Sequence, residues 1–201
     1  DDSAVALLSA ALGSPFEPVA AAHLPAGIGA AKARALLRLE HFSYAVDHRA
    51  MELARLLKAH GKPELVEGPA SETLWRQVRD TAFFAGEDSA VWRLSVAPTR
   101  GPQASAAIAR TLPAARWFYD WGGGLVWLSV PAEGDAGAAA IRAAIAATGG
   151  HATLVRAPDA IRAAVDVFQP QAPALMKITA GLKAAHDPAT IINPGLMFAG
   201  V

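Results

Sequence analysis

The sequence predicts an α+β fold of the ferredoxin-like type, built on a largely antiparallel sheet. Residues 90–157 follow the order β-α-β-β-α-β, which is the split βαβ pattern. Residues 3–68 follow the order α-β-β-α-β, which is the same pattern without its first strand. Gly122-Gly123 separates two apolar segments, as in a hairpin. We therefore expect a duplicated split βαβ arrangement with helices on one face of the sheet and a helical C-terminal tail.

The first half of the chain supplies the incomplete unit. Val46, Ala50 and Leu53 recur at helical spacing, and Gly61 followed by Pro63 is a typical helix end. The expected elements are a helix over 3–12, strands over 16–23 and 34–42, a helix over 44–60 with Ser43 as its N-cap, a strand over 64–67, and a helix over 72–84 capped by Ser71.

The second half supplies the complete unit. Trp92, Leu94 and Val96 alternate with more polar residues, as expected for a strand with one buried face. The expected elements are strands over 90–97, 116–121, 124–130 and 151–157, and helices over 103–111, 135–148, 159–167 and 173–185.

The length of the loop at Gly122-Gly123 decides which side chains share a face of the sheet, since a three-residue loop would move one strand's entire set to the other face. We expect a two-residue loop. It pairs Trp117 with Leu128 and places on one face Trp117, Tyr119, Trp121, Val126, Leu128 and Val130. This more apolar set should lie under the helices. The other face should be open and mixed, with Arg93, Ser95, Arg116, Phe118, Asp120, Leu125, Trp127 and Ser129.

Composition excludes several classes of function. Lys and Arg number 18 and Asp and Glu number 18, and this balance argues against nucleic acid or an anionic membrane as the main partner. Cysteine is absent, and no HxxH or HxxxH pair occurs among His41, His48, His60, His151 and His186, so we expect no metal site. No secretion signal or membrane-spanning run is evident, and we expect a cytoplasmic protein.

The C-terminal tail combines turn residues with apolar side chains. Asp187-Pro188 should end the last helix, because proline disfavours the αR conformation of the residue before it. Asn193-Pro194-Gly195 should form a turn. Frayed tails are usually polar, whereas this one carries Ile191, Ile192, Leu196, Met197 and Phe198. The tail should therefore dock, either on its own domain or on another.

Five segments carry a resemblance to a known family. They are SAALGSPFEPVAAAHLP at 9–25, VWRLSVAPT at 91–99, WFYDWGGGLVWL at 117–128, GGHATLVRAP at 149–158 and LKAAHDPATIINPGLMF at 182–198. In this order they resemble the C-terminal half of FAD-linked oxidases of the vanillyl-alcohol-oxidase/PCMH superfamily, and within it the FAD-binding (E) subunits of bacterial glycolate oxidases. Leu196 stands where that family usually has arginine, and His186 where it usually has an aromatic residue.

The resemblance implies a cap domain over residues 1–167 and, over 168–201, a helix and tail that would dock on a separate FAD domain. It implies FAD as the cofactor of the full-length subunit only, because these residues contain no Gly-rich diphosphate loop. By the same resemblance, the mixed face of the predicted sheet would form the roof of the substrate site. The implied cofactor-binding residues are Asn193, Gly195 and Arg93, and the implied substrate-binding residues are Arg93, Trp127 and His151.

The implied reaction is oxidation of a 2-hydroxy acid, glycolate to glyoxylate. The implied partners are a second flavin subunit and an iron-sulfur subunit, through which the protein would lie in the cytoplasm or at the periphery of the inner membrane. Two alternatives stay open: a non-enzymatic ferredoxin-like domain for ligand sensing or assembly, and a cap from a sibling oxidase that acts on another alcohol or sugar acid.

Overall fold

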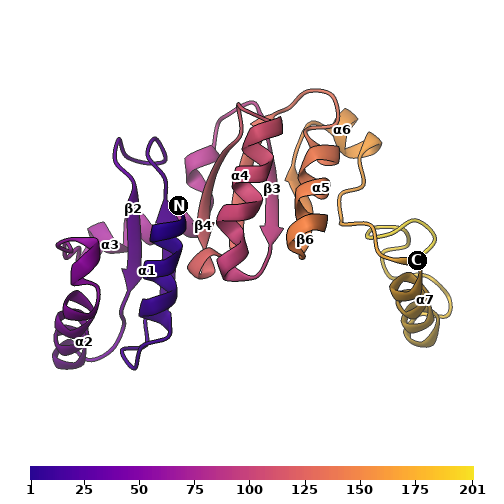
Figure 1. The fold of residues 1–201 in the computed structure, drawn as a ribbon. Coiled ribbons are helices and arrows are strands. Elements are labelled where there is room, and N and C mark those ends of the chain that lie inside the picture. The colour runs from indigo at the N-terminus through magenta and orange to yellow at the C-terminus, as the bar shows by residue number, and fades with distance from the viewer.

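The computed structural model, which describes residues 1–201, centres on one six-stranded antiparallel sheet (Figure 1). Its strands are β1 (Ala20–Leu24), β2 (Arg34–Arg38), β3 (Ser89–Ser95), β4 (Arg116–Asp120), β5 (Leu125–Pro131) and β6 (His151–Arg156). They lie in the order β2-β1-β4-β5-β3-β6, and every neighbouring pair is antiparallel. The predicted α+β class is confirmed, and the order β4-β5-β3-β6 is compatible with a ferredoxin-like arrangement.

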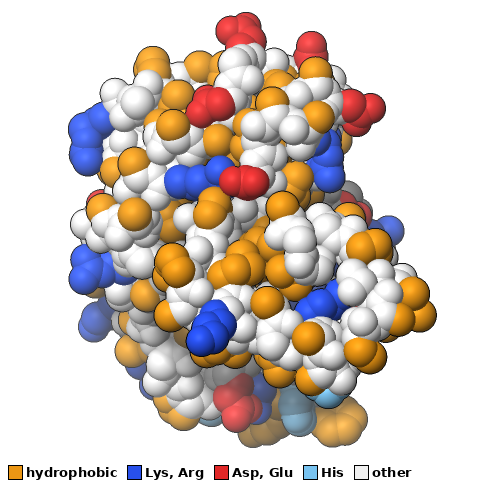
Figure 2. All heavy atoms as spheres, turned by 90° about the vertical axis from the view of Figure 1, so that its right-hand side faces the viewer, with side chains coloured by type: hydrophobic (Ala, Val, Ile, Leu, Met, Phe, Trp, Pro, Cys, Tyr) orange, Lys and Arg blue, Asp and Glu red, His pale blue; other side chains and the backbone are white.

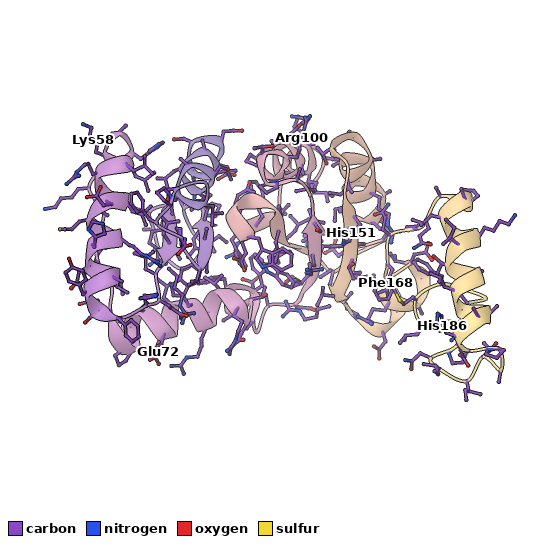
Figure 3. All side chains as sticks on the ribbon, turned by 90° about the horizontal axis from the view of Figure 1, so that it is seen from below. Lys58, Glu72, Arg100, His151, Phe168 and His186 are labelled. Atoms are coloured by element: carbon purple, nitrogen blue, oxygen red, sulfur yellow. The ribbon has the colours of Figure 1, made fainter.

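Helices pack on both faces of this sheet. They are α1 (Asp2–Leu12), α2 (Ser43–Leu56), α3 (Gly68–Arg79), α4 (Gly101–Thr111), α5 (Ala138–Thr148), α6 (Asp159–Ala164) and α7 (Pro173–His186), with short 3-10 helices η1 (Lys58–His60), η2 (Ala82–Phe84), η3 (Pro98–Arg100) and η4 (Trp121–Gly123). Seen from below, α1, α4 and α5 lie on one side of the sheet and α3 lies on the other (Figure 3). We call these two sides the α4 face and the α3 face.

The α4 face holds the main hydrophobic core. Trp92 and Leu94 on β3 and Leu128 on β5 are fully buried there, as the alternation of their strands predicted. They pack with Ile108 of α4 and Ile141 of α5. Because the Trp92 indole also donates a hydrogen bond of 2.9 Å to the carbonyl of Ala136, its one polar atom is satisfied in the core.

The register of the β4–β5 hairpin is confirmed, since Trp117 lies opposite Leu128 and Tyr119 opposite Val126. Its loop is longer than predicted: β4 ends at Asp120 and β5 begins at Leu125. A four-residue loop keeps the same alternation as a two-residue loop, so the predicted faces hold for the strand residues.

Trp121 was predicted to be the last residue of β4 and to lie under the helices, and it does neither. It lies in the loop with a φ of 51°, its side chain is 57 % exposed, and its ring lies beside Arg93 of the α3 face. The loop itself needs glycine: a Cβ on Gly123 would lie 2.7 Å from the carbonyl oxygen of Pro98.

The α3 face was predicted to be open, and this prediction is wrong. Trp75 and Val78 of α3, together with Phe84 of η2, pack on Phe118 and on neighbouring side chains of β1 and β3. Phe118 is consequently fully buried. An amphipathic helix needs an apolar surface to cover, and this half of the sheet face is apolar enough to provide it.

The predicted strand at 64–67 does not exist, so the first unit lacks a strand that its sequence pattern suggested. These residues adopt no regular structure, and Leu65 is 67 % exposed. β2 therefore remains an edge strand that pairs with β1 alone.

Several predicted helix boundaries also shift. Phe42 rather than Ser43 precedes α2 as its N-cap, and α3 begins at Gly68, with proline in its first turn, before Ser71. Thr81, which is in the left-handed conformation at a φ of 53°, separates α3 from η2 where one helix was expected. None of the helices combines the length and the apolar character needed to cross a bilayer.

The last helix and the tail lie beyond β6, at the opposite end of the molecule from α2 (Figure 1). The segment before them is tied to the sheet, because the amide of Leu154 donates to the carbonyl of Val167 at 2.8 Å. None of the side chains of α7 is buried. The division of the chain at residue 168 stays a prediction.

Candidate functional site

A cavity of about 830 Å³ opens on the α3 face, between α3 and the end of the β4–β5 hairpin. Its charged lining consists of Arg38, Glu72, Arg76, Arg79, Arg93 and Asp120, and its aromatic lining of Trp75, Trp121 and Trp127. Arginines thus outnumber carboxylates, and the site favours an anion.

Arg93 forms part of the floor of this cavity. It lies at the middle of β3, directly opposite Trp127 of β5 and Thr153 of β6. Its guanidinium carbon lies 5.2 Å from the centroid of the Trp121 ring, within range for a cation–π contact. Arg93 makes no ion pair with any carboxylate of the chain. Its charge is therefore available to a ligand.

The other arginines of the cavity are already paired. Arg76 contacts Glu72 one turn earlier at 3.1 Å, and Arg79 holds the carboxylate of Asp80 with bonds of 2.7 and 3.0 Å. Arg38 pairs with Glu40. These three exposed pairs neutralise most of the charge on the rim, which leaves Arg93 as the cation of the floor.

Asp120 supplies the carboxyl group of the site. It ends β4, and its Oδ1 accepts the backbone N–H of Trp121 at 2.8 Å. Burial raises the pKa of Asp120, and this hydrogen bond offsets part of the rise. A carboxyl group with a raised pKa in the same cavity as an unpaired arginine is an arrangement that can bind an acid and exchange a proton with it.

The structure brings together only some of the predicted site residues. Arg93 and Trp127 line the same cavity, on the predicted face. His151 does not line it: this residue is exposed at the start of β6 and lies opposite Ser95 (Figure 3). Asn193 and Gly195 lie in the tail and do not line it either. The roles predicted for these residues stay predictions.

Sequence reasoning missed Trp121 and the arginines of α3. It placed Trp121 under the helices by extending the strand by one residue into the loop. Arg76 and Arg79 reach the cavity only because α3 lies across the sheet, and no pattern within α3 specifies which sheet face it covers. Asp120 was placed on the correct face, and its alternation with Phe118 was the signal that could have identified it.

The predicted turn in the tail is present. Asn193 has a φ of 46° and Gly195 a φ of 70°, and the amide of Leu196 donates to the carbonyl of Asn193 at 3.2 Å. The segment that leads to this turn is held by Asp187, whose carboxylate accepts the amides of Ile191 and Ile192 at 3.0 and 2.9 Å.

Asp187 is held in its charged form. Lys183 lies 2.7 Å away on the preceding helical turn, and this contact, together with the two amides, lowers the pKa of Asp187 to about 2. His186, which stands where the resembling family has an aromatic residue, is exposed at the end of α7.

A second polar cluster lies under α1, on the α4 face. The Asp1 carboxylate accepts Tyr119 Oη at 2.8 Å and Trp117 Nε1 at 3.0 Å, and its other oxygen lies 2.9 Å from His23 Nε2. Tyr119 Oη also lies 2.5 Å from Ser105 Oγ. Burial lowers the pKa of His23 and raises the pKa of Tyr119 to about 12. None of its residues lines the α3-face cavity, and we assign the cluster a structural role.

His23 is the histidine that the sequence analysis did not consider. Its neighbours in sequence are apolar, and nothing local distinguishes it from a core residue. No group of three or more His, Cys, Asp or Glu side chains is arranged to hold a metal ion.

Comparison with known proteins supports the resemblance drawn from the sequence. No family model matches the chain. Over 126 residues, which are 62 % of this chain, it is 32 % identical to glycolate oxidase subunit GlcE of Escherichia coli strain K12. The matched region is 31 % of that protein, so the chain spans about a third of the length of the curated relative it matches.

Proposed function

We propose that the chain is the cap part of a glycolate-oxidase-like FAD-binding subunit and contributes to the oxidation of a 2-hydroxy acid, with glycolate to glyoxylate as the named case. The observation that carries this proposal is the unpaired Arg93 on the floor of the α3-face cavity. The similarity to glycolate oxidase subunit GlcE supports the reaction class.

The residues of the cavity suit the substrate end of such a site better than the cofactor end. Gly122-Gly123-Gly124 is no phosphate cradle, because Cβ atoms on Gly122 and Gly123 would meet Leu12, Val5 and the Pro98 carbonyl of the chain itself. The diphosphate of FAD would therefore be held by residues outside this chain segment. Arg93 and Trp127 would face the flavin ring or the substrate.

Two residues of the cavity, Arg93 and Asp120, have a chemical role in this proposal. FAD, when bound, supplies the acceptor for the two electrons that leave the C2 carbon of the substrate. Arg93 would bind the substrate carboxylate through its N–H edge and orient the C2–H bond. Asp120 would accept the proton of the substrate hydroxyl group, since its raised pKa favours holding a proton.

The tail would dock on the FAD-binding domain. The exposed apolar residues at this end are Leu175, Ile178, Leu182, Ile191, Ile192, Leu196 and Met197. Figure 2 views the molecule from this end and shows hydrophobic side chains spread among Lys and Arg. A second flavin subunit and an iron-sulfur subunit would complete the complex, in the cytoplasm or at the periphery of the inner membrane.

The test is an Arg93→Gln substitution in the full-length subunit, assembled with its partners. Loss of the carboxylate contact should lower kcat/KM for glycolate by about tenfold to a few hundredfold, the range for a charge-assisted hydrogen bond. Arg110→Gln is the matched control, because Arg110 is exposed on α4, on the other face of the sheet. The rate is measured as reduction of an electron-accepting dye by the assembled wild-type subunit. If no 2-hydroxy acid supports this reduction, the proposal is contradicted.

A non-enzymatic small-ligand-binding domain is the second candidate. It is favoured by a cavity that residues of this chain line by themselves. Flavin bleaching on addition of a 2-hydroxy acid to the assembled subunit would exclude it, whereas ligand binding without bleaching would support it.

A further inference from the structure

The cavity on the α3 face is larger than a two- or three-carbon acid requires. Its volume of about 830 Å³ falls in the range of roughly 300–1,000 Å³ that holds drug-sized ligands. Glycolate bound at Arg93 would fill only a small part of this space. The residues that line the remaining walls of the cavity therefore indicate what the rest of the ligand is.

Those walls are aromatic. Trp75 comes from α3, Trp121 from η4 and Trp127 from β5, so three separate elements each contribute an indole ring. Trp75 is 8 % exposed and supports the wall from within the core, whereas Trp121 is 57 % exposed. Indole rings at these positions offer stacking surfaces to a flat apolar group.

Arg93 and Trp121 together set the orientation of the ligand. The guanidinium carbon of Arg93 lies 5.2 Å from the centroid of the Trp121 ring, and a guanidinium held over a ring can still offer its N–H edge to a bidentate carboxylate. Trp127 lies directly opposite Arg93 in the sheet, and its side chain occupies the same face. A carboxylate at Arg93 therefore places the rest of the ligand among the tryptophans.

The cavity offers one free cation rather than several. Arg38, Arg76 and Arg79 are paired with Glu40, Glu72 and Asp80. A second carboxylate on the ligand would have to displace one of these acids. The charge balance thus favours a single carboxylate.

We propose that this cavity binds an aromatic monocarboxylate, with its carboxylate on Arg93 and its ring between Trp121 and Trp127. The identification of the cavity as the substrate site rests on the proposed function, whereas the binding itself does not. If both hold, the substrate class extends from glycolate to 2-hydroxy acids that carry an aromatic group.

The experiment is calorimetric titration of the chain with three compounds: phenyllactate, lactate and 2-phenylethanol. Phenyllactate differs from lactate by the phenyl group, and phenylethanol lacks the carboxylate. Phenyllactate should bind about tenfold or more tighter than either, because the ring and the carboxylate each contribute. Equal affinity for lactate and phenyllactate, or for phenyllactate and phenylethanol, overturns the proposal.

Substitutions of cavity residues test whether phenyllactate binds in this cavity. Arg93→Gln should weaken phenyllactate binding about tenfold or more, whereas Arg110→Gln should leave it unchanged. Trp127→Leu should weaken phenyllactate binding more than it weakens lactate binding. Because Trp127 packs partly against the buried cluster under α3, the exposed Trp121→Ser serves as a second aromatic variant, with the same result expected. Phenyllactate binding that neither aromatic variant weakens overturns the proposal.

The outcome separates this inference from the proposed function. Phenyllactate binding at Arg93 in a subunit that oxidises no 2-hydroxy acid supports the inference and contradicts the function. Arg93-dependent oxidation of glycolate by a chain that does not bind phenyllactate contradicts the inference and supports the function.

Discussion

At the scale of single residues, Tyr119 shows how a buried polar group stabilises this fold. It is fully buried in the α4-face core, and its hydroxyl group is shared between Asp1 and Ser105. Its ring also stacks on His23 at 5.6 Å between centroids. One side chain therefore links α1, β1, β4 and α4.

The Tyr119→Phe variant should lose about 1–3 kcal/mol of unfolding free energy, because the buried Ser105 hydroxyl and the Asp1 carboxylate each lose a hydrogen-bond partner. Urea unfolding at neutral pH measures this loss. Arg110→Gln, on the exposed side of α4, is a control that should leave the urea midpoint unchanged. A Tyr119→Phe midpoint equal to that of the wild-type chain would show that the cluster is not stabilising.

The pKa of Tyr119 also predicts the alkaline limit of stability. Burial raises this pKa from 10.0 to about 12, so the folded state holds the proton more tightly than the unfolded state. The contribution is fully present below about pH 10 and is lost as the pH rises toward about 12. Wild-type stability should fall across this window more steeply than that of Tyr119→Phe, which follows from urea midpoints measured at several alkaline pH values.

At the scale of elements, the junction of α7 and the tail depends on one carboxylate. The Asp187 carboxylate forms an ion pair with Lys183 and accepts hydrogen bonds from the amides of Ile191 and Ile192. It therefore fixes the end of the helix and the path of the segment that leads to the turn. The contacts are local in sequence. The turn should therefore form independently of the sheet.

Asp187→Asn should loosen the turn, because a neutral amide lacks the charge for Lys183 and offers one oxygen to two amides. Hydrogen exchange at Ile191 and Ile192 should accelerate, while exchange in β3 stays unchanged. The lowered pKa predicts the same loosening on acidification: the stabilisation is present above the usual carboxyl pKa near 3.8 and is lost as the pH falls through about 2. Equal protection in the variant would assign the turn to Pro188 and Pro194 instead.

Local patterns predicted the strands and failed where packing decides. Alternation in β3, β4 and β5 placed Arg93, Asp120 and Trp127 on the correct face, since a strand has a strict period of two. The segment at 64–67 contains Leu65 and Val66 but pairs with no strand, so the local pattern alone misassigned it. The cavity could not be predicted, because its other wall is α3, and the position of α3 depends on contacts distant in sequence.

At the scale of the whole molecule, the sheet and the C-terminal helix differ in how many of their side chains are buried. α7 buries none of its side chains, whereas β3, which lies between β5 and β6 in the sheet, has fully buried residues. A chain ending at residue 169 keeps the segment that hydrogen-bonds to β6, through Val167 and Gln169. This truncation should leave the free energy of unfolding, measured with urea, within about 0.5 kcal/mol of the value for the full chain, as for other changes remote from a core. A large loss would mean that the tail packs on the sheet in solution.

The single residue pair that joins β1 to β4, His23 with Tyr119, divides the sheet into a two-stranded hairpin and a four-stranded body. Such a seam has few backbone hydrogen bonds, and local opening starts where these are fewest. The cavity straddles it: Ala20 and Arg38 belong to the hairpin, and Asp120 and Arg93 to the body. Breathing of the hairpin would therefore widen the entrance for a ligand while the floor stays rigid, which gives the sheet a hinge as well as a scaffold.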